Sequence, residues 1–270
     1  MGNCIFLRRG APPSSGPPKG KTLNEYTWEE ISYISSNGLA GEYGFQVGDA
    51  KEIILNGTVG GLTLDNYSTY AFIIGINHNA AVEGNNLIHF QFGKTALSGG
   101  TNICFVDSGY NNSKTSGSWF NMNNSNTNSG GWENSRMRTV ICPAFKYIMP
   151  SDLRAVLKTV TKYSDNTGGG SDTASYVTAT TDNIFLLATY EVFGSTSYTN
   201  SAERNYQARY QYYKNGNSNV KYKHSSTSSN AYSWLRSVCV NISTGFCRSQ
   251  SSSSSSGASY SLGFAPAFCV

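Results

Sequence analysis

The chain has 270 residues, of which 13% are charged and 13% are aromatic, and its formal net charge is +4. This composition excludes a disordered chain, which would hold few aromatic residues, and a protein that grips nucleic acid through its phosphates, which would need a dense basic face. No apolar run approaches the roughly 20 residues of a membrane span, so we expect no membrane insertion. The scarce charges are replaced by Ser, Asn, Thr, Gly and Tyr, which is typical of a β-rich domain with a neutral, hydroxyl- and amide-rich surface.

Residues 1–23 form an N-terminal attachment segment in our interpretation, and residues 24–270 form a single domain. Within the first segment, 1–10 is a short extended arm and 11–20 is a linker, because its four prolines impose extended backbone. The basic pair at 8–9 follows a short apolar stretch rather than preceding it, which is the reverse of a secretion signal. We therefore expect a protein made in the cytoplasm without such a signal.

The first regular element of the domain is a helix that begins after Thr27. Thr27 and Glu30 give the pattern of a capping box, and the pair at 37–38, Asn-Gly, ends the helix. Its apolar face comprises Trp28, Ile31 and Ile34. Short apolar runs bounded by turn residues then predict strands over 51–55, 70–76, 87–92 and 102–106.

The segment 107–135 is dense in Asn, Ser and Gly and is expected to be a long irregular loop. A structureless loop of this length is unusual in a compact domain. Its embedded aromatic residues, Trp119, Phe120 and Trp132, indicate that it is held down at several points.

The second half of the chain predicts fewer clear elements. After a short helix that Ser151 is expected to cap, residues 177–194 are expected to form two strands, or one strand and a loop. A second clear helix is expected from Ser201 to Gly216, with a tyrosine stripe that favours a core position. The serine-rich stretch 249–259 is expected to be a loop because folded sequence brackets it.

Cysteine and histidine residues indicate no catalytic or metal centre. The six cysteines leave open three disulfides, with fifteen connectivities, or six free thiols. Their apolar surroundings favour buried free thiols. No Cys-x-x-Cys pair occurs and the three histidines are scattered. The chain also lacks a G-x-S-x-G nucleophile elbow, so we expect no catalytic residue, metal or cofactor.

Several long motifs stand in one order along the chain. They are NSGGWENSRMR (128–138), YEVFGSTSYTNSAERNYQARY (190–210), WLRS (234–237), GFCRS (245–249) and the terminal LGFAPAFCV. With the NCIFLRRG start and the TLNEYTWEEIS helix, they resemble a family of phage, prophage and gut-Firmicutes proteins over nearly the whole chain. The pattern W-x-R-S … G-F-x-P-A-F is similar, more distantly, to the fold shared by C-type lectins and the formylglycine-generating enzyme, although Ala265 stands where an Arg is common.

The resemblance implies an α+β fold, namely an irregular C-type-lectin-like domain with short antiparallel strands, about two to three helices and long loops, preceded by the extended arm. In such a fold Arg236 would pair with a buried carboxylate or carbonyl, and Phe264 would join the core. The expected scaffold residues are Trp234, Arg236, Phe246, Gly263, Pro266 and Phe268. Variable proteins diversified by retroelements use this scaffold, and the sequence leaves open whether this chain is one of them.

The same resemblance places ligand-binding loops at 107–135 and 238–260. Small polar side chains there can hydrogen-bond a ligand without large strain, as Tyr, Ser, Gly and Asn do in antibody paratopes. The candidate binding residues are Trp119, Trp132, Val238, Val240, Asn241, Ser243, Thr244, Arg248, Gln250, Ser251 and Tyr260. The alternative is that these segments are solvated loops without a partner.

The function we expect is that of a phage or prophage tail-associated receptor-binding protein, an adhesin located in the virion. It would recognise a bacterial cell-surface glycan or protein, attach to other tail proteins through residues 1–20, and act as a homo-oligomer whose many sites supply avidity. Two alternatives remain at this point. One is a structural tail subunit, and the other is an enzyme, either a glycan or cell-wall hydrolase or a formylglycine-type oxidase.

Overall fold

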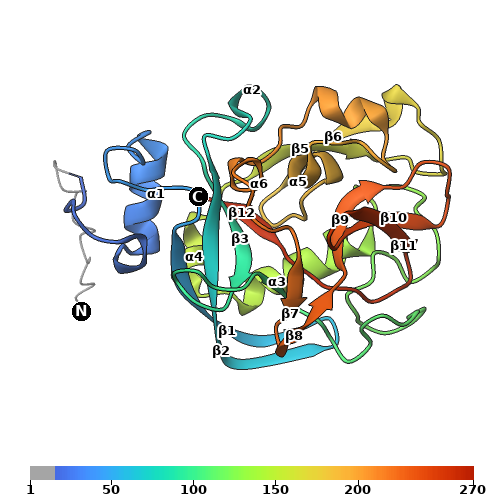
Figure 1. Cartoon of the computed structure of the whole chain (residues 1–270), viewed down its shortest axis with the longest axis horizontal. Coiled ribbons are helices and arrows are strands. Elements are labelled where there is room, and N and C mark those ends of the chain that lie inside the picture. The colour runs from blue at the N-terminus through green and yellow to red at the C-terminus, as the bar shows by residue number, and fades with distance from the viewer. Residues whose placement is uncertain (1–15) are drawn as a thin grey trace, which may run out of the picture.

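The computed structural model describes residues 16–270, which form a mixed α/β fold with mostly antiparallel sheets (Figure 1). The described residues contain six short α-helices: α1 (Trp28–Ser36), α2 (Ala80–Glu83), α3 (Cys142–Ile148), α4 (Ser151–Val156), α5 (Thr189–Phe193) and α6 (Gln211–Lys214). The irregular helical turns are η1 (Leu23–Glu25), η2 (Met137–Ile141), η3 (Ala174–Tyr176) and η4 (Ser201–Asn205). No helix in this part of the chain is long and apolar enough to cross a membrane.

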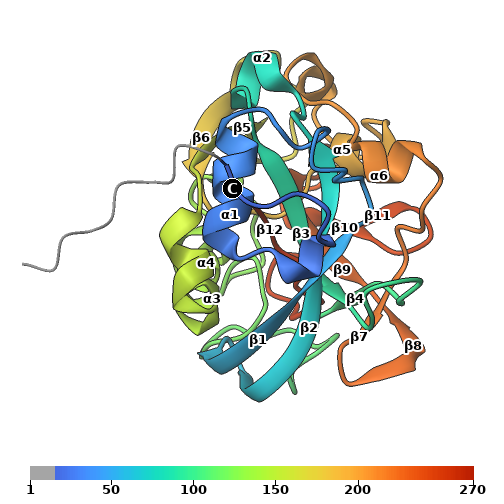
Figure 2. The ribbon, with the colours of Figure 1, turned by 90° about the vertical axis from the view of Figure 1, so that its left-hand side faces the viewer.

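The largest sheet has the strand order β1-β2-β3-β12, and it joins the beginning of the domain to its end. Its strands are β1 (Ala50–Val59), β2 (Leu62–Ile76), β3 (Ile88–Lys94) and β12 (Ala267–Cys269). β1 and β2 form a long hairpin, and β12 pairs antiparallel with β3 (Figure 2). The C-terminal strand is therefore part of the central sheet.

Three smaller sheets complete the fold. They have the orders β11-β10-β9, β4-β7-β8 and β5-β6, and only the β4–β7 pair is parallel among the strand pairs of residues 16–270. Their strands are β4 (Ile103–Cys104), β5 (Val160–Asp165), β6 (Val177–Asp182), β7 (Lys221–Lys223), β8 (Ser226–Ala231), β9 (Ser233–Val238), β10 (Gly245–Ser249) and β11 (Ser253–Gly257).

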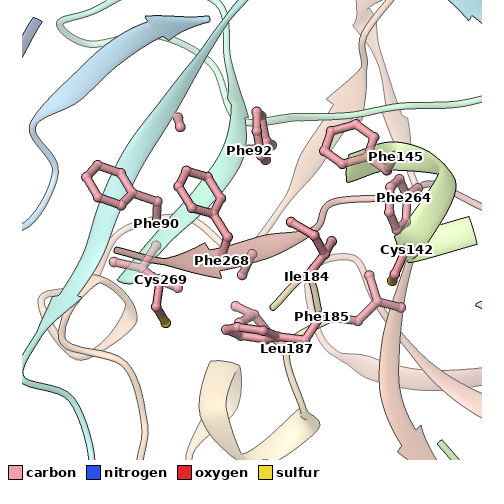
Figure 3. Packing of buried hydrophobic residues seen from close by; sticks show 14 of the residues in the cluster. Phe90, Phe92, Cys142, Phe145, Ile184, Phe185, Leu187, Phe264, Phe268 and Cys269 are labelled. Atoms are coloured by element: carbon pink, nitrogen blue, oxygen red, sulfur yellow. The ribbon is translucent and has the colours of Figure 1, made fainter. Parts of the chain in front are cut away.

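An aromatic core lies between α1, the central sheet and α3 (Figure 3). The ring of Phe268 on β12 stacks on Phe90 with 5.3 Å between ring centroids, and Trp28 of α1 packs edge-on against both rings. Full burial of one such side chain contributes roughly 3 kcal/mol to stability. These contacts fix α1 on the sheet.

Helix α1 has the ends that the sequence predicts. The side chain of Thr27 accepts a hydrogen bond from the Glu30 N–H, and the Glu30 carboxylate accepts one from the Thr27 N–H at 2.7 Å. This reciprocal capping satisfies two of the free N–H groups at the helix start. A local pattern therefore determines this element without help from distant residues.

Other elements differ from the prediction, and each difference has a long-range cause. The helix expected over 201–216 is two short helical segments, η4 and α6. They are separate because Tyr210, between them, has extended backbone and stacks its ring on the buried ring of His78. The stretch 177–194 is β6, a loop and a helix, α5, rather than two strands or one strand and a loop. The serine run at 249–259 contains a strand, β11, because it pairs with β10. Six helices replace the two or three expected among the described residues.

Candidate functional site

The two segments expected to bind a ligand lie side by side. We call residues 107–135 the Asn-rich loop and residues 238–260 the hairpin segment. Backbone N–H groups of the Asn-rich loop donate to the hairpin segment at three places, namely Lys114 to Ser259 (2.7 Å), Asn123 to Ala258 (3.0 Å) and Asn128 to Ser243 (2.9 Å). The two segments therefore form one continuous surface, which we call the composite surface.

Asn128 is the side chain that joins the parts of the composite surface. It is fully buried, and its Nδ2 lies within hydrogen-bond distance of three carbonyl oxygens of the hairpin segment: Cys239 (3.2 Å), Ile242 (2.8 Å) and Gly245 (2.9 Å). Its Oδ1 accepts a hydrogen bond from the N–H of Gly169 at 2.9 Å. The glycine turn at 168–170 is thereby a third part of this surface. The sequence did not single out this residue.

Asp107 fixes the beginning of the Asn-rich loop. Its buried carboxylate accepts hydrogen bonds from the N–H groups of Gly109 (2.8 Å) and Phe120 (2.7 Å), and from the hydroxyl of Ser261. Sequence reasoning missed Asp107 as well, although its place directly after an apolar strand is a signal for a turn. The Asp107 carboxylate thus connects the start of the Asn-rich loop to Ser261, which follows the hairpin segment.

The predicted binding residues divide into three groups by exposure. The exposed ones are Asn241, Ser243, Ser251 and Tyr260, and the half-buried ones are Trp119, Val240, Thr244, Arg248 and Gln250. Trp132 and Val238 are buried, which corrects their expected place on the surface. The Trp132 indole N–H donates to the Asp182 carboxylate at 3.1 Å, so this ring belongs to the core.

All six predicted scaffold residues are buried. Trp234, Arg236, Phe246 and Phe268 are all at most 1% exposed. The carbonyl of Pro266 accepts a hydrogen bond from Phe92. The backbone of Gly263 pairs with Tyr232 and Trp234, and a Cβ there would collide with the Cys104 thiol. This glycine is required by close packing.

Arg236 forms the centre of a buried ionic cluster. Its guanidinium makes a bidentate pair with Glu191, with distances of 2.5 and 2.9 Å. The Lys162 ammonium lies 2.6 Å from the Glu83 carboxylate and 3.3 Å from that of Glu191, and it donates to the Tyr210 hydroxyl. Two carboxylates and two cations thus face one another inside the protein, which balances their charges.

Burial sets the protonation of the groups around this cluster. It raises the pKa of Glu83, whereas the charges of Arg236 and Lys162 outweigh burial at Glu191 and hold its pKa below the ordinary value. Burial, with the Lys162 charge, lowers the pKa of His78 to about 3. The Nε2 atoms of His78 and His89 have no hydrogen-bond partner in the described part of the chain. Burial also lowers the pKa of His89 well below its ordinary value, so both histidines are neutral at pH 7.

This cluster has the residue types of a metal centre but is already neutralised. Ligand atoms of His78, Glu83 and Glu191 lie within 4.8 Å of one another. The Lys162 ammonium, however, contacts both carboxylates and supplies the positive charge that a metal ion would bring. Three surface pockets of about 590, 260 and 100 Å³ lie elsewhere, and no member of the cluster lines them. We interpret the cluster as part of the core.

Comparison with known protein families identifies the family of this chain. Residues 107–270 match the family model described as Domain of unknown function (DUF6273). The chain belongs to this family. Its matched region begins with the Asn-rich loop and includes the hairpin segment, so the whole composite surface lies within the DUF6273 region. The search of curated proteins gave no match. The search of solved structures gave none either.

The cysteines of the described residues are not arranged as exposed nucleophiles. Cys104, Cys142, Cys239, Cys247 and Cys269 are buried free thiols, as the sequence favours, and the remaining Cys4 lies outside the described residues. The Sγ atoms of Cys239 and Cys247 are 3.3 Å apart. Burial raises the pKa of the Cys247 thiol well above its ordinary value. The thiolate, which is the reactive form, is therefore disfavoured.

Proposed function

We propose that this protein is a phage or prophage tail-associated receptor-binding protein that presents the composite surface to a bacterial surface glycan or protein. The observation that carries the proposal is the joining of the Asn-rich loop, the hairpin segment and the 168–170 turn through the single side chain of Asn128. Loops held on a rigid scaffold are the usual carriers of recognition.

The chemistry of the composite surface suits a ligand rich in hydroxyl groups. Asn241, Ile242 and Ser243 are three consecutive exposed residues in the turn of the hairpin segment, and Ile242 is 42% exposed. The backbone of Val240 pairs with that of Tyr198, whose side chain is 56% exposed. An aromatic ring next to amide and hydroxyl groups offers stacking and hydrogen bonds together.

The virion location, the lectin-like character of the fold and the attachment role rest on the resemblance described above. Attachment through residues 1–20 falls mostly outside the described residues, which begin at residue 16. From there Tyr43 and Tyr26 donate hydrogen bonds to the carbonyls of Pro17 and Pro18, so the linker leaves the domain at a fixed point. Assembly into a homo-oligomer would add avidity to weak single sites.

Binding of the fluorescently labelled protein to intact bacteria of a candidate host panel tests the proposal. The test variant is Tyr198→Ala/Ile242→Ser, which removes the exposed side chain of Ile242 from the composite surface and that of Tyr198 beside it. Its matched control is Tyr147→Ala/Val140→Ser, since these residues are 75% and 47% exposed and lie outside the composite surface. We expect saturable binding that the test variant loses by at least tenfold and the control keeps. Absence of saturable binding by the folded wild type across the panel would contradict the proposal and favour a structural tail subunit.

A further inference from the structure

Three cationic side chains at one side of the composite surface lie over aromatic rings. The Lys114 ammonium is 4.4 Å from the ring centroid of Trp119, the Lys223 ammonium is 4.7 Å from that of Tyr110, and the Arg248 guanidinium is 3.6 Å from that of Tyr232. Such cation–aromatic contacts hold a long side chain in one orientation. We call these six residues the cationic row.

The three pairs of the cationic row are in contact with one another. The hydroxyl of Tyr110 accepts a hydrogen bond from the Tyr232 N–H at 2.7 Å, which joins the second pair to the third. A Cβ added to Gly109, the neighbour of Tyr110, would lie 2.6 Å from Lys114 and 2.9 Å from Trp119, so the first pair packs directly on this glycine. The cations therefore follow one another along a single strip of surface.

None of the three cations has an acidic partner in the part of the chain that the structure describes. Among residues 16–270, Lys114, Lys223 and Arg248 take part in no salt bridge. Within the same residues, Arg248 donates only its Nε, to the Ser255 carbonyl at 3.0 Å, which leaves both of its Nη groups for a ligand. The nearby carboxylate of Asp107 is buried and accepts its hydrogen bonds from Gly109, Phe120 and Ser261. All three cationic side chains are only partly buried.

We propose that the cationic row binds an anionic glycan whose repeating units bear carboxylate or phosphate groups. This inference rests on the proposed function and names its ligand class. The free fork of Arg248 suits bidentate binding of either acid group. Aromatic support lowers the entropy lost when the cations are fixed by a ligand. The adjoining hydroxyl and amide side chains would bind the sugar hydroxyls. A purely ionic partner would leave these side chains unused.

Binding to defined polymers tests this inference. The probes are polygalacturonate for carboxylates, poly(glycerol phosphate) teichoic acid for phosphates, and neutral dextran. The test variant is Lys114→Gln/Lys223→Gln/Arg248→Gln. A charge-matched control is Lys146→Gln/Arg204→Gln/Lys214→Gln, because these three cations are outside the row and form no ion pair among the described residues. Circular dichroism of both variants establishes that they are folded.

We expect the wild type to bind at least one anionic polymer and not dextran, with affinity that falls as salt is added. The row variant should lose at least tenfold in affinity, while the control keeps it. Which polymer binds identifies the acid group. Equal binding by the row variant and the control, or equal competition by duplex DNA, would overturn the inference. If the wild type binds intact cells and the row variant binds them equally well, the inference fails and the proposed receptor-binding function stands.

Discussion

Replacement of Asn128 by Ala should release the hairpin segment from the rest of the composite surface. The buried amide of Asn128 is shared by three carbonyls of that segment and by the Gly169 N–H. Because the Nδ2 group has two hydrogens, it makes at most two full hydrogen bonds at a time. With the bond that Oδ1 accepts, three hydrogen bonds are lost.

The size of the effect follows from this count. Each bond contributes about 1 kcal/mol, and the buried carbonyls left without a donor add a further penalty. We therefore expect Asn128→Ala to lower the free energy of unfolding by about 3–5 kcal/mol. Asn128→Asp should cost at least as much, since it places a carboxylate oxygen against three carbonyl oxygens.

Urea denaturation measures the loss, and hydrogen exchange followed by mass spectrometry locates it. The expected result for Asn128→Ala is an increase in the exchange rate over the wild type that is larger in residues 239–245 than in the central sheet. Asn126→Ala is the control, because Asn126 is exposed in the same loop, and it should change stability by less than about 0.5 kcal/mol. A loss below 1 kcal/mol in Asn128→Ala, with unchanged exchange in the hairpin segment, would refute the claim that this amide joins the loops.

Three further predictions concern the interior. Arg236→Met should lower the free energy of unfolding by about 3–5 kcal/mol in urea, because it leaves the Glu191 charge poorly compensated, and a loss below 1 kcal/mol would contradict this role. Burial raises the pKa of Glu203 to about 7 from the ordinary 4.5, so its contribution to stability is present below pH 4.5 and is lost as the pH rises through 7. Between pH 4 and pH 8 the wild type should therefore lose about 3 kcal/mol relative to Glu203→Gln, as measured by urea denaturation, and parallel profiles would refute it. Peptide-level alkylation should leave Cys104, Cys142, Cys239, Cys247 and Cys269 unmodified until the protein is unfolded, and rapid native labelling of any of them would contradict their burial.

Elements that depend on local pattern were predictable from the sequence. Helix α1 begins at its Thr27–Glu30 capping box, and its apolar face is buried as its spacing predicts. The strand runs over 51–55, 70–76 and 87–92 lie in or overlap β1, β2 and β3. In these cases the residues that determine the element lie within it.

Elements that depend on distant partners were not predictable. The tyrosine spacing over 201–216 indicates a continuous helix, yet Tyr210 is fixed by His78 and Lys162, far away in the chain. Helix α5 is capped by Glu191, whose carboxylate also pairs with Arg236.

The candidate site follows the same division. Composition indicated which segments are polar and loop-forming, and the resemblance pointed to their use. The exposure of single residues was not predictable, because it depends on distant partners: Trp132 is buried and its indole N–H donates to Asp182, which lies 50 residues away. The junction at Asn128 was missed because an asparagine in a loop rich in asparagines carries no local signal of burial.

The most direct test of the recognition account is cell binding by the wild type beside Tyr198→Ala/Ile242→Ser, with Tyr147→Ala/Val140→Ser as control, all at matched folded concentration. We expect saturable binding by the wild type and the control, and at least a tenfold loss in Tyr198→Ala/Ile242→Ser. Undiminished binding by that variant would show that the protein contacts cells through another face.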